Sequence, residues 1–210
     1  YDGAVWGRGG PSPLRKWKTP IRIGVLHGPS VPPAQRARDI EMVTDYSARL
    51  SRLTGHPIEI GGRVNFWVIF ADQDHRAEIL ANAAAKLPDI TVDSLTALRD
   101  LRPGAYCAVA AFATGDDAHT YTSAVALIPS ENPALLRQSC VHEEIAQALG
   151  LANDSPEARP SIFNDDDEFA LLTSHDELLL KMLYDPRLRP GLLWPHARSI
   201  VDEIAQELVQ

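Results

Sequence analysis

The apolar residues of this chain follow two periodicities, and the changes between them divide the sequence into strands and helices. Alternating or continuous apolar runs predict strands over residues 18–27, 58–60, 65–70, 105–112 and 120–128. Apolar residues three or four apart predict helices over 34–53, 76–87, 93–101, a segment ending at 150, 171–185 and 195–208. The sheet comes mostly early and the helices concentrate late, which predicts an α+β fold.

Two of these helices carry recognisable signals at their starts. Thr173 is expected to cap the helix that follows it, and Asp176, three residues on, completes a capping box. The helix ending at residue 150 can begin in either of two places. Asn132 is one candidate cap, with Pro133 in the first turn, and Ser139 is a later start.

The rest of the chain is organised around residues 140–154, with the sequence C-V-H-E-E-I-A-Q-A-L-G-L-A-N-D. Its apolar residues recur at helical spacing and are expected to face the core, whereas Glu143 and Gln147 share the opposite face. Gly150 lies where a left-handed residue would end the helix. Asn153 and Asp154 follow at once and are expected to turn back toward Glu143 and Gln147, which predicts the skeleton of a metal or catalytic site.

Composition narrows the classes of protein that the chain can belong to. The 210 residues are 45% hydrophobic, which suits a single domain over residues 17–210 after a flexible, Gly- and Pro-rich arm over residues 1–16. Lys and Arg number 20 against 28 Asp and Glu, so the net charge is 20 − 28 = −8. An acidic chain without a basic cluster argues against a nucleic-acid partner. No apolar run is long enough to span a membrane.

The cysteines leave two alternatives open. Cys107 falls in a predicted strand and Cys140 at the start of the central helical stretch. One disulfide between them would hold that helix to the sheet. The other alternative is a pair of buried free thiols.

The central stretch resembles the metzincin metallopeptidases, which carry H-E-x-x-H-x-x-G-x-x-H and a downstream turn built around methionine. With Gly150 as the fixed glycine, the resemblance places Glu143 at the first zinc ligand and Glu144 at the general base. It places Gln147 at the second ligand and Asn153, with Asp154 next to it, at the third.

Features on both sides of the stretch extend this resemblance. The sequence P-S-I-F-N at residues 160–164 is similar to the methionine turn, with Phe163 in place of methionine. Residues 172–184 resemble the C-terminal helix of matrixin-like members. The implied fold is a zincin-like mixed sheet, packed against a long N-terminal helix and an active-site-type helix, with a helical C-terminal part.

The whole chain also resembles an uncharacterised proteobacterial family of predicted lipoproteins, on E-E-x-x-Q-x-x-G-L-x-N-D, S-I-F-N-D-D and L-Y-D-P-R-L-R-P-G. This resemblance implies a periplasmic or cell-envelope location, with a lipid anchor upstream of this chain, and no known activity.

Every position that matches a metzincin zinc ligand carries an oxygen donor, and this departure decides the expected chemistry. Zinc prefers imidazole and thiolate, whereas carboxylate and amide oxygens suit calcium or magnesium. We therefore expect no zinc cofactor, and a pseudo-peptidase that serves as a binding or structural module for a peptide or an envelope protein. Two alternatives remain: a hydrolase with Glu144 as general base and Gln147 as oxyanion donor, and a subunit of a larger envelope assembly.

Three nearby features are expected to carry no chemistry. His142 is expected to be exposed, and His175 to lie without a role in the first turn of its helix. The acidic run at residues 165–167 lacks the spacing of a calcium-binding loop and is expected to be a solvated loop.

Overall fold

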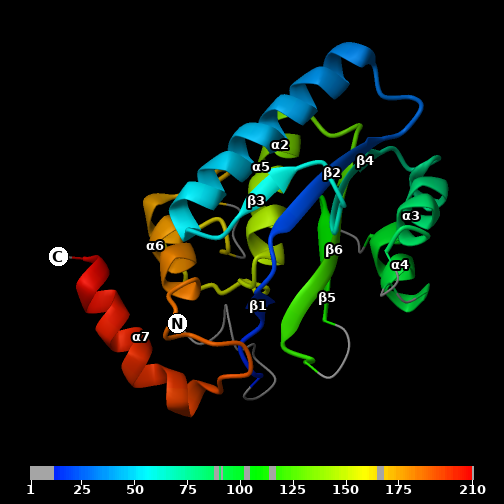
Figure 1. Ribbon diagram of the computed structural model, residues 1–210. Helices are drawn as coiled ribbons and strands as arrows, with labels where there is room; N and C mark the ends of the chain where they lie inside the picture. Colours follow the sequence, from blue (N-terminus) through cyan, green and yellow to red (C-terminus); the bar gives the residue numbers. More distant parts are fainter. Residues whose placement is uncertain are drawn as a thin grey trace.

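The computed structural model describes residues 12–87, 90, 92–101, 105–113, 117–164 and 168–209. Within these ranges the strands are β1 Lys16–Trp17, β2 Ile21–His27, β3 Ile58–Ile60, β4 Phe66–Ala71, β5 Ala108–Ala113 and β6 Thr120–Pro129. The helices are α2 Pro33–Thr54, α3 Arg76–Ala84, α4 Val92–Arg99, α5 Ala134–Ala148, α6 Ser174–Leu183 and α7 Trp194–Leu208 (Figure 1).

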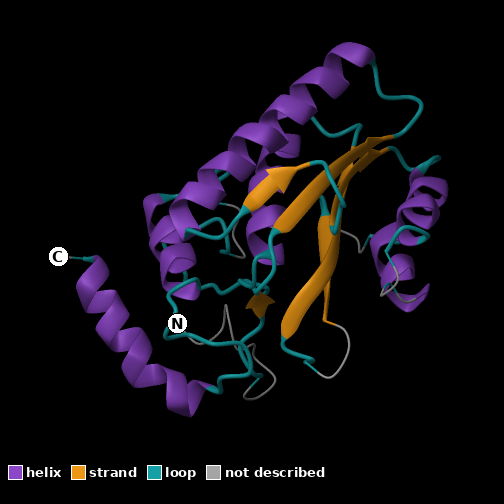
Figure 2. Cartoon of the chain, in the orientation of Figure 1, coloured by secondary structure: helices purple, strands orange, loops and turns teal. Residues whose placement is uncertain are grey.

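The strands form one mixed sheet that is mostly parallel (Figure 2). β3, β2, β4 and β6 lie side by side in this order and are parallel, and β1 is parallel to the start of β6. β5 pairs antiparallel with β6. The α+β prediction is confirmed, with a mostly parallel sheet and six helices in the described residues.

Helices cover both faces of the sheet, and the alternation of apolar residues along β4 and β6 shows why. Val68 and Phe70 belong to the larger core, together with residues of α2, α5 and α6. Ile69 and Ala71, their neighbours in sequence, belong to a smaller core with residues of α3 and α4. Because successive side chains of a strand point to opposite faces, a fully apolar strand must be covered on both sides.

Two predicted boundaries differ from the structure. The strand predicted over residues 18–27 begins later, at Ile21 directly after Pro20, and Lys16–Trp17 forms a separate short strand before it. α5 begins at Ala134 with Pro133 as its N-cap residue, so the earlier of the two predicted starts is close to the observed one. The described helices include none that is long and apolar enough to cross a membrane.

Residues at the end of the predicted N-terminal arm are packed into the domain. Leu14 is fully buried, and its N–H donates to the Leu192 carbonyl at 2.9 Å. The Lys16 ammonium is also buried and donates to the Leu183 carbonyl at 2.7 Å. The described part of the arm, residues 12–16, therefore runs along the domain and joins it to the segments around α6.

Candidate functional site

α5 is the helix that carries the candidate site, and its apolar stripe is buried as predicted. Val141, Ile145, Ala148 and Leu149 are fully buried in the larger core. Glu144 lies within the same stripe, three residues after Val141 and four before Ala148, and only 4% of it is exposed. The stripe spacing was thus a signal in the sequence that Glu144 points inward rather than to solvent.

The C-terminus of α5 is held by two aromatic side chains. The Trp17 indole N–H donates to the Ala148 carbonyl at 2.8 Å, and the Tyr184 hydroxyl donates to the Leu149 carbonyl at 3.0 Å. These donors satisfy carbonyls that a helix leaves without partners at its end. Gly150 follows with a φ of 133°, and a Cβ there would come within 2.4 Å of the Arg15 carbonyl oxygen. Glycine is required both by its conformation and by the close approach of the chain.

The segment after Gly150 returns to α5, as the sequence predicted for Asp154. The Gln147 amide donates to an Asp154 carboxylate oxygen at 2.9 Å, near the surface. Asn153 is half-buried. The predicted pairing of the α5 surface with the following loop is therefore present, and it uses the amide group of Gln147 to hold Asp154.

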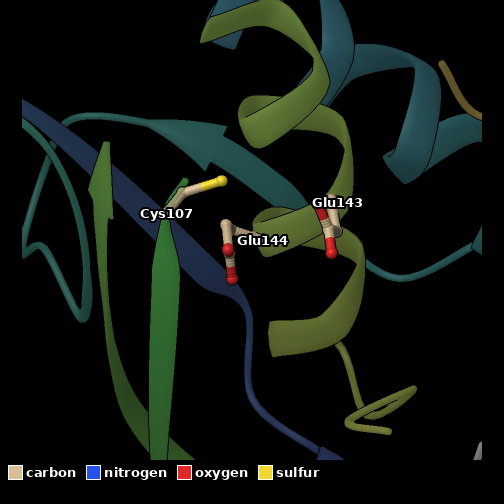
Figure 3. Close-up of side chains that lie close together, drawn as sticks. All are labelled: Cys107, Glu143 and Glu144. Carbon is tan, nitrogen blue, oxygen red and sulfur yellow. The ribbon is translucent and has the colours of Figure 1, made fainter. Parts of the chain in front are cut away.

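Glu143 and Glu144 lie beside Cys107, which precedes β5. One carboxylate oxygen of each glutamate and the Cys107 sulfur lie within 4.8 Å of one another. Figure 3 shows Glu144 projecting from α5 toward the strand that follows Cys107, with Glu143 beside it. The three side chains, which we call the carboxylate–sulfur cluster, come from two elements that are far apart in sequence.

Glu144 is an unusual member of this cluster because one of its carboxyl oxygens, Oε2, is buried without a hydrogen-bond partner among the described residues. Burial raises the pKa of Glu144 well above its ordinary value of 4.5, and the nearby carboxylates of Glu143 and Asp154 raise it further. Burial therefore disfavours the charged carboxylate of Glu144, and a cation or a hydrogen-bond donor placed beside it would lower its pKa again.

Cys107 and Cys140 form a disulfide, so the first of the two alternatives for the cysteines is confirmed. The sulfurs are 2.04 Å apart and the Cα atoms 5.9 Å apart. The bridge holds the start of β5 to α5, as the sequence predicted for a bonded pair. In this state the Cys107 sulfur is not a thiolate, and the cluster offers a cation only the two carboxylates.

Zinc does not fit the positions that the metzincin frame assigns to its ligands. These positions hold Glu143, Gln147 and Asn153, and the amide of Gln147 already donates to Asp154. An oxygen-only set of this kind suits calcium or magnesium better than zinc.

The turn predicted at residues 160–164 lies against the core and is held by α6. Phe163 is fully buried, in the same core as the apolar residues of α5. The Asp176 carboxylate accepts hydrogen bonds from the Ser161 hydroxyl and from the Ile162 N–H, the latter at 3.1 Å. It also accepts from the Thr173 N–H at 2.9 Å, so the predicted capping box is confirmed and gains a second role.

The prediction that His142 is exposed is wrong. Its ring stacks on Tyr46 with centroids 4.1 Å apart, and its Nδ1 accepts from the Leu172 N–H at 3.1 Å. Burial lowers its pKa from 6.5 to about 4. His175 lies in the first turn of α6, where its Nδ1 is 3.2 Å from the Pro160 carbonyl oxygen. The acidic run at residues 165–167 lies outside the described residues.

A groove of about 460 Å³ opens beside the carboxylate–sulfur cluster, and the sequence did not predict it. We call it the disulfide groove; its lining residues are Tyr106, Cys107, Pro133, Leu135, Leu136, Ser139, Cys140, Glu143, Ile162, Phe169 and Ala170. Leu135 is 60% exposed and Tyr106 is 53% exposed, so apolar side chains stand at its edge. Its residues come from three distant segments, which explains why no local pattern indicated it.

A second, larger groove of about 560 Å³ lies between α2 and α5. Charged residues of both helices line it, including Arg38, Asp39, Asp45, Arg49 and Arg137. Beneath it, the Arg137 guanidinium donates to the buried Asp39 carboxylate at 3.2 Å. None of the residues that the sequence predicted as a site lines this groove, so the disulfide groove is the one that adjoins the candidate site.

The fold and the site define an α+β protein with a mostly parallel sheet, in which a buried helix presents a carboxylate–sulfur cluster at an apolar groove. The chain belongs to the family described as "Protein of unknown function (DUF2927)", which matches residues 2–203. A search among curated proteins found no match.

Proposed function

We propose that this protein is a non-catalytic binding module of the cell envelope, with a metzincin-like scaffold that lacks the zinc-ligand set. Its disulfide groove binds an extended peptide segment through apolar side chains. The observation that carries the proposal is the lining of this groove, which is mostly apolar with Glu143 at one side. Apolar lining with a few placed polar groups is the usual composition of a ligand site.

The position of β5 explains why the bound segment would be extended. In the described sheet β5 is paired with β6 alone, and its start lies next to Tyr106 and Cys107 of the groove. A peptide can add to such a strand through main-chain hydrogen bonds and place alternate side chains in an adjacent pocket. The groove then supplies the specificity that the main chain cannot.

The state of Glu144 supports binding rather than catalysis. A general base must reach the proton that it removes, at hydrogen-bond distance or through one water. Glu144 is 4% exposed, and its raised pKa favours the protonated form, which is not a base. The order of elements supports the metzincin-like scaffold: a long helix follows β2, strands come next, and α5 precedes the turn held by Asp176.

The envelope location rests on the disulfide and on the resemblance to predicted lipoproteins. Disulfides persist in oxidising compartments such as the bacterial periplasm. Fractionation of cells that express the full-length gene product tests this part. Recovery with periplasmic or membrane fractions supports it, and recovery with cytosol overturns it. A partner that co-purifies stoichiometrically from the membrane fraction would instead favour a subunit of a larger assembly.

Peptide binding is tested with a displayed library of extended apolar peptides, followed by fluorescence anisotropy on the selected sequences. Replacement Leu135→Glu places a charge at the edge of the groove and is expected to weaken binding by at least about 10-fold. Ile40→Glu is the matched control, because Ile40 is an exposed apolar residue of α2 that does not line the groove. Equal affinities for the two variants would rule out the groove as the binding site.

The second candidate is a hydrolase that uses Glu144 as general base, and the observation that favours it is the position of Glu144 beside Glu143 and Cys107, which line the disulfide groove. Quenched fluorescent peptides measure it directly. Turnover by the wild type that Glu144→Gln abolishes would establish the hydrolase and end the binding-only proposal. No turnover by either protein, with peptide still bound, would support the module.

A further inference from the structure

We propose that reduction of the Cys107–Cys140 disulfide converts the carboxylate–sulfur cluster into a zinc site. The ligands are the sulfurs of Cys107 and Cys140 and the carboxylates of Glu143 and Glu144. In the oxidised protein this site is closed, because the two sulfurs are bonded to each other. The inference is independent of the proposed peptide binding and concerns a different chemical state of the same region.

Three of the four side chains lie close together, and the sulfur of the fourth, Cys140, is bonded to that of Cys107. Cys140, Glu143 and Glu144 are at i, i+3 and i+4 of α5, so they lie on neighbouring positions of one helix. Cys107 approaches from the start of β5, and its sulfur is within 4.8 Å of an oxygen of each glutamate. Ligands of a tetrahedral zinc ion are roughly 3.3–3.8 Å apart, so the three grouped side chains must draw closer by about 1 Å, and the freed Cys140 sulfur must turn toward them.

Glu144 supplies the observation that points to a ligand. It is 4% exposed, and its Oε2 has no hydrogen-bond partner in the part of the chain that the structure describes. Buried polar atoms in native proteins almost always have partners, so an unpartnered one calls for a reason. A cation beside the cluster would satisfy this oxygen and offset the repulsion between the neighbouring carboxylates.

The disulfide groove gives both a reductant and an ion a route to the cluster. Cys107, Cys140 and Glu143 all line this groove of about 460 Å³. A dithiol is therefore able to reach the bridge without unfolding of the domain. The ligands of the metzincin frame, by comparison, include Gln147, which does not line the groove.

The chemistry balances with a dithiol reductant of the thioredoxin type. One of its thiolates attacks a sulfur of the Cys107–Cys140 bridge, and its second thiolate resolves the mixed disulfide. Two electrons and two protons thus pass to Cys107 and Cys140, and the reductant becomes a disulfide. Zinc then displaces the two thiol protons and the proton of the Glu144 carboxyl, so binding releases protons.

The test is zinc binding to the intact chain before and after reduction, measured by competition with a chromophoric chelator. A phosphine serves as reductant, since it takes up oxygen from water and leaves no thiol to bind the metal. The reduced protein is expected to bind one zinc, with an affinity at least roughly 100-fold above that of the oxidised protein. Equal binding in both states, or none after reduction, would overturn the proposal. Cobalt(II) added in place of zinc should give thiolate-to-metal charge-transfer absorption.

Three variants test which side chains bind the zinc ion. Glu144→Gln keeps both thiols and is expected to weaken zinc binding to the reduced protein by at least about 10-fold. Gln147→Ala and the exposed Glu203→Gln are expected to change it by less than about 2-fold, within the spread of substitutions outside the coordination shells. An unchanged zinc affinity in Glu144→Gln, or loss of zinc binding in Gln147→Ala, would place the ion elsewhere and overturn the proposal.

Folding is followed by circular dichroism in the same samples. If the reduced protein unfolds, refolding on addition of zinc supports the site, because metal-binding energy is then folding energy. Failure to refold with zinc overturns it. The double variant Cys107→Ser/Cys140→Ser shows whether the domain folds without the bridge, and it is expected to bind no zinc.

Discussion

Two buried carboxyl groups, Asp176 of α6 and Glu144 of α5, have opposite environments. Asp176 is fully buried and accepts hydrogen bonds from the Ser161 hydroxyl, the Ile162 N–H, and the N–H and hydroxyl of Thr173. Glu144 is almost as deeply buried, yet its Oε2 has no partner among the residues described. Burial alone therefore does not show what a carboxyl group does.

The hydrogen bonds of Asp176 explain a structural role, whereas Glu144 Oε2 has no such contacts among the described residues. The donors around Asp176 come from the 160–164 turn and from the start of α6, so one carboxylate fixes two segments together. Burial raises the pKa of Glu144, the carboxylates of Glu143 and Asp154 raise it further, and no described residue donates to its Oε2. An unsatisfied group of this kind costs stability and persists where it serves binding or chemistry.

Removal of the satisfied carboxylate should have the largest effect on stability. Asp176→Ala is expected to lower the free energy of unfolding by about 4 kcal/mol, because it leaves several buried donors without an acceptor and removes half of a capping box. Urea denaturation measures the change. Glu177→Ala is the control: Glu177 pairs with Arg49 at 2.8 Å at a partly exposed position and should cost less than about 1 kcal/mol. Similar losses for the two variants would show that the Asp176 contacts contribute little.

The sequence predicted the local half of the Asp176 environment and missed the rest. Thr173 and Asp176 are three residues apart, and a capping box depends only on such local spacing. The contact between Asp176 and Ser161 joins residues 15 apart through the tertiary fold, and no periodicity reports it. The same limit applies to the disulfide groove, which three separate segments form.

The helical period of the apolar residues predicted the central helix, but it did not predict which of its polar side chains are buried. Val141 and Ile145 repeat at the helical period, which determines the helix and its buried stripe. The position of Glu144 lies inside that stripe, but the metzincin resemblance placed it only at the general base, and its burial was not predicted. His142 was predicted to be exposed, and its burial depends on stacking against Tyr46 of a distant helix.

The second largest effect should come from His142 as the pH falls. Burial lowers its pKa to about 4, whereas the unfolded chain has the ordinary value of 6.5. Between these values the unfolded state binds a proton that the folded state does not, so stability declines as the pH falls from 6.5 toward 4. The loss is about 3 kcal/mol by pH 4. In His142→Asn this part of the pH dependence should vanish; a profile parallel to that of the wild type would contradict it.

Glu144 should affect stability in the opposite direction. Its pKa is raised in the folded state, so the folded protein holds a proton that the unfolded chain loses above about 4.5. The wild type therefore loses stability as the pH rises through the folded pKa. Glu144→Gln removes this loss and should become more stable relative to the wild type with rising pH, by about 1–3 kcal/mol. Urea denaturation at a series of pH values from 5 to about 8 measures the difference. A variant that loses stability at every pH would place Glu144 with Asp176 as a structural carboxyl.

The smallest effect is expected at the rim of the site, where Gln147 donates to Asp154 at 2.9 Å near the surface. Exposed hydrogen bonds exchange readily with water, so Gln147→Ala should change the free energy of unfolding by less than about 0.5 kcal/mol. A double-mutant cycle with Asp154→Ala measures the coupling of the pair and should give a similarly small value. A coupling energy above about 2 kcal/mol would instead show that the Gln147–Asp154 hydrogen bond stabilises the fold. With a small coupling, the buried Glu144 carboxyl and the Cys107–Cys140 disulfide remain the two features at α5 that combine burial with reactive groups.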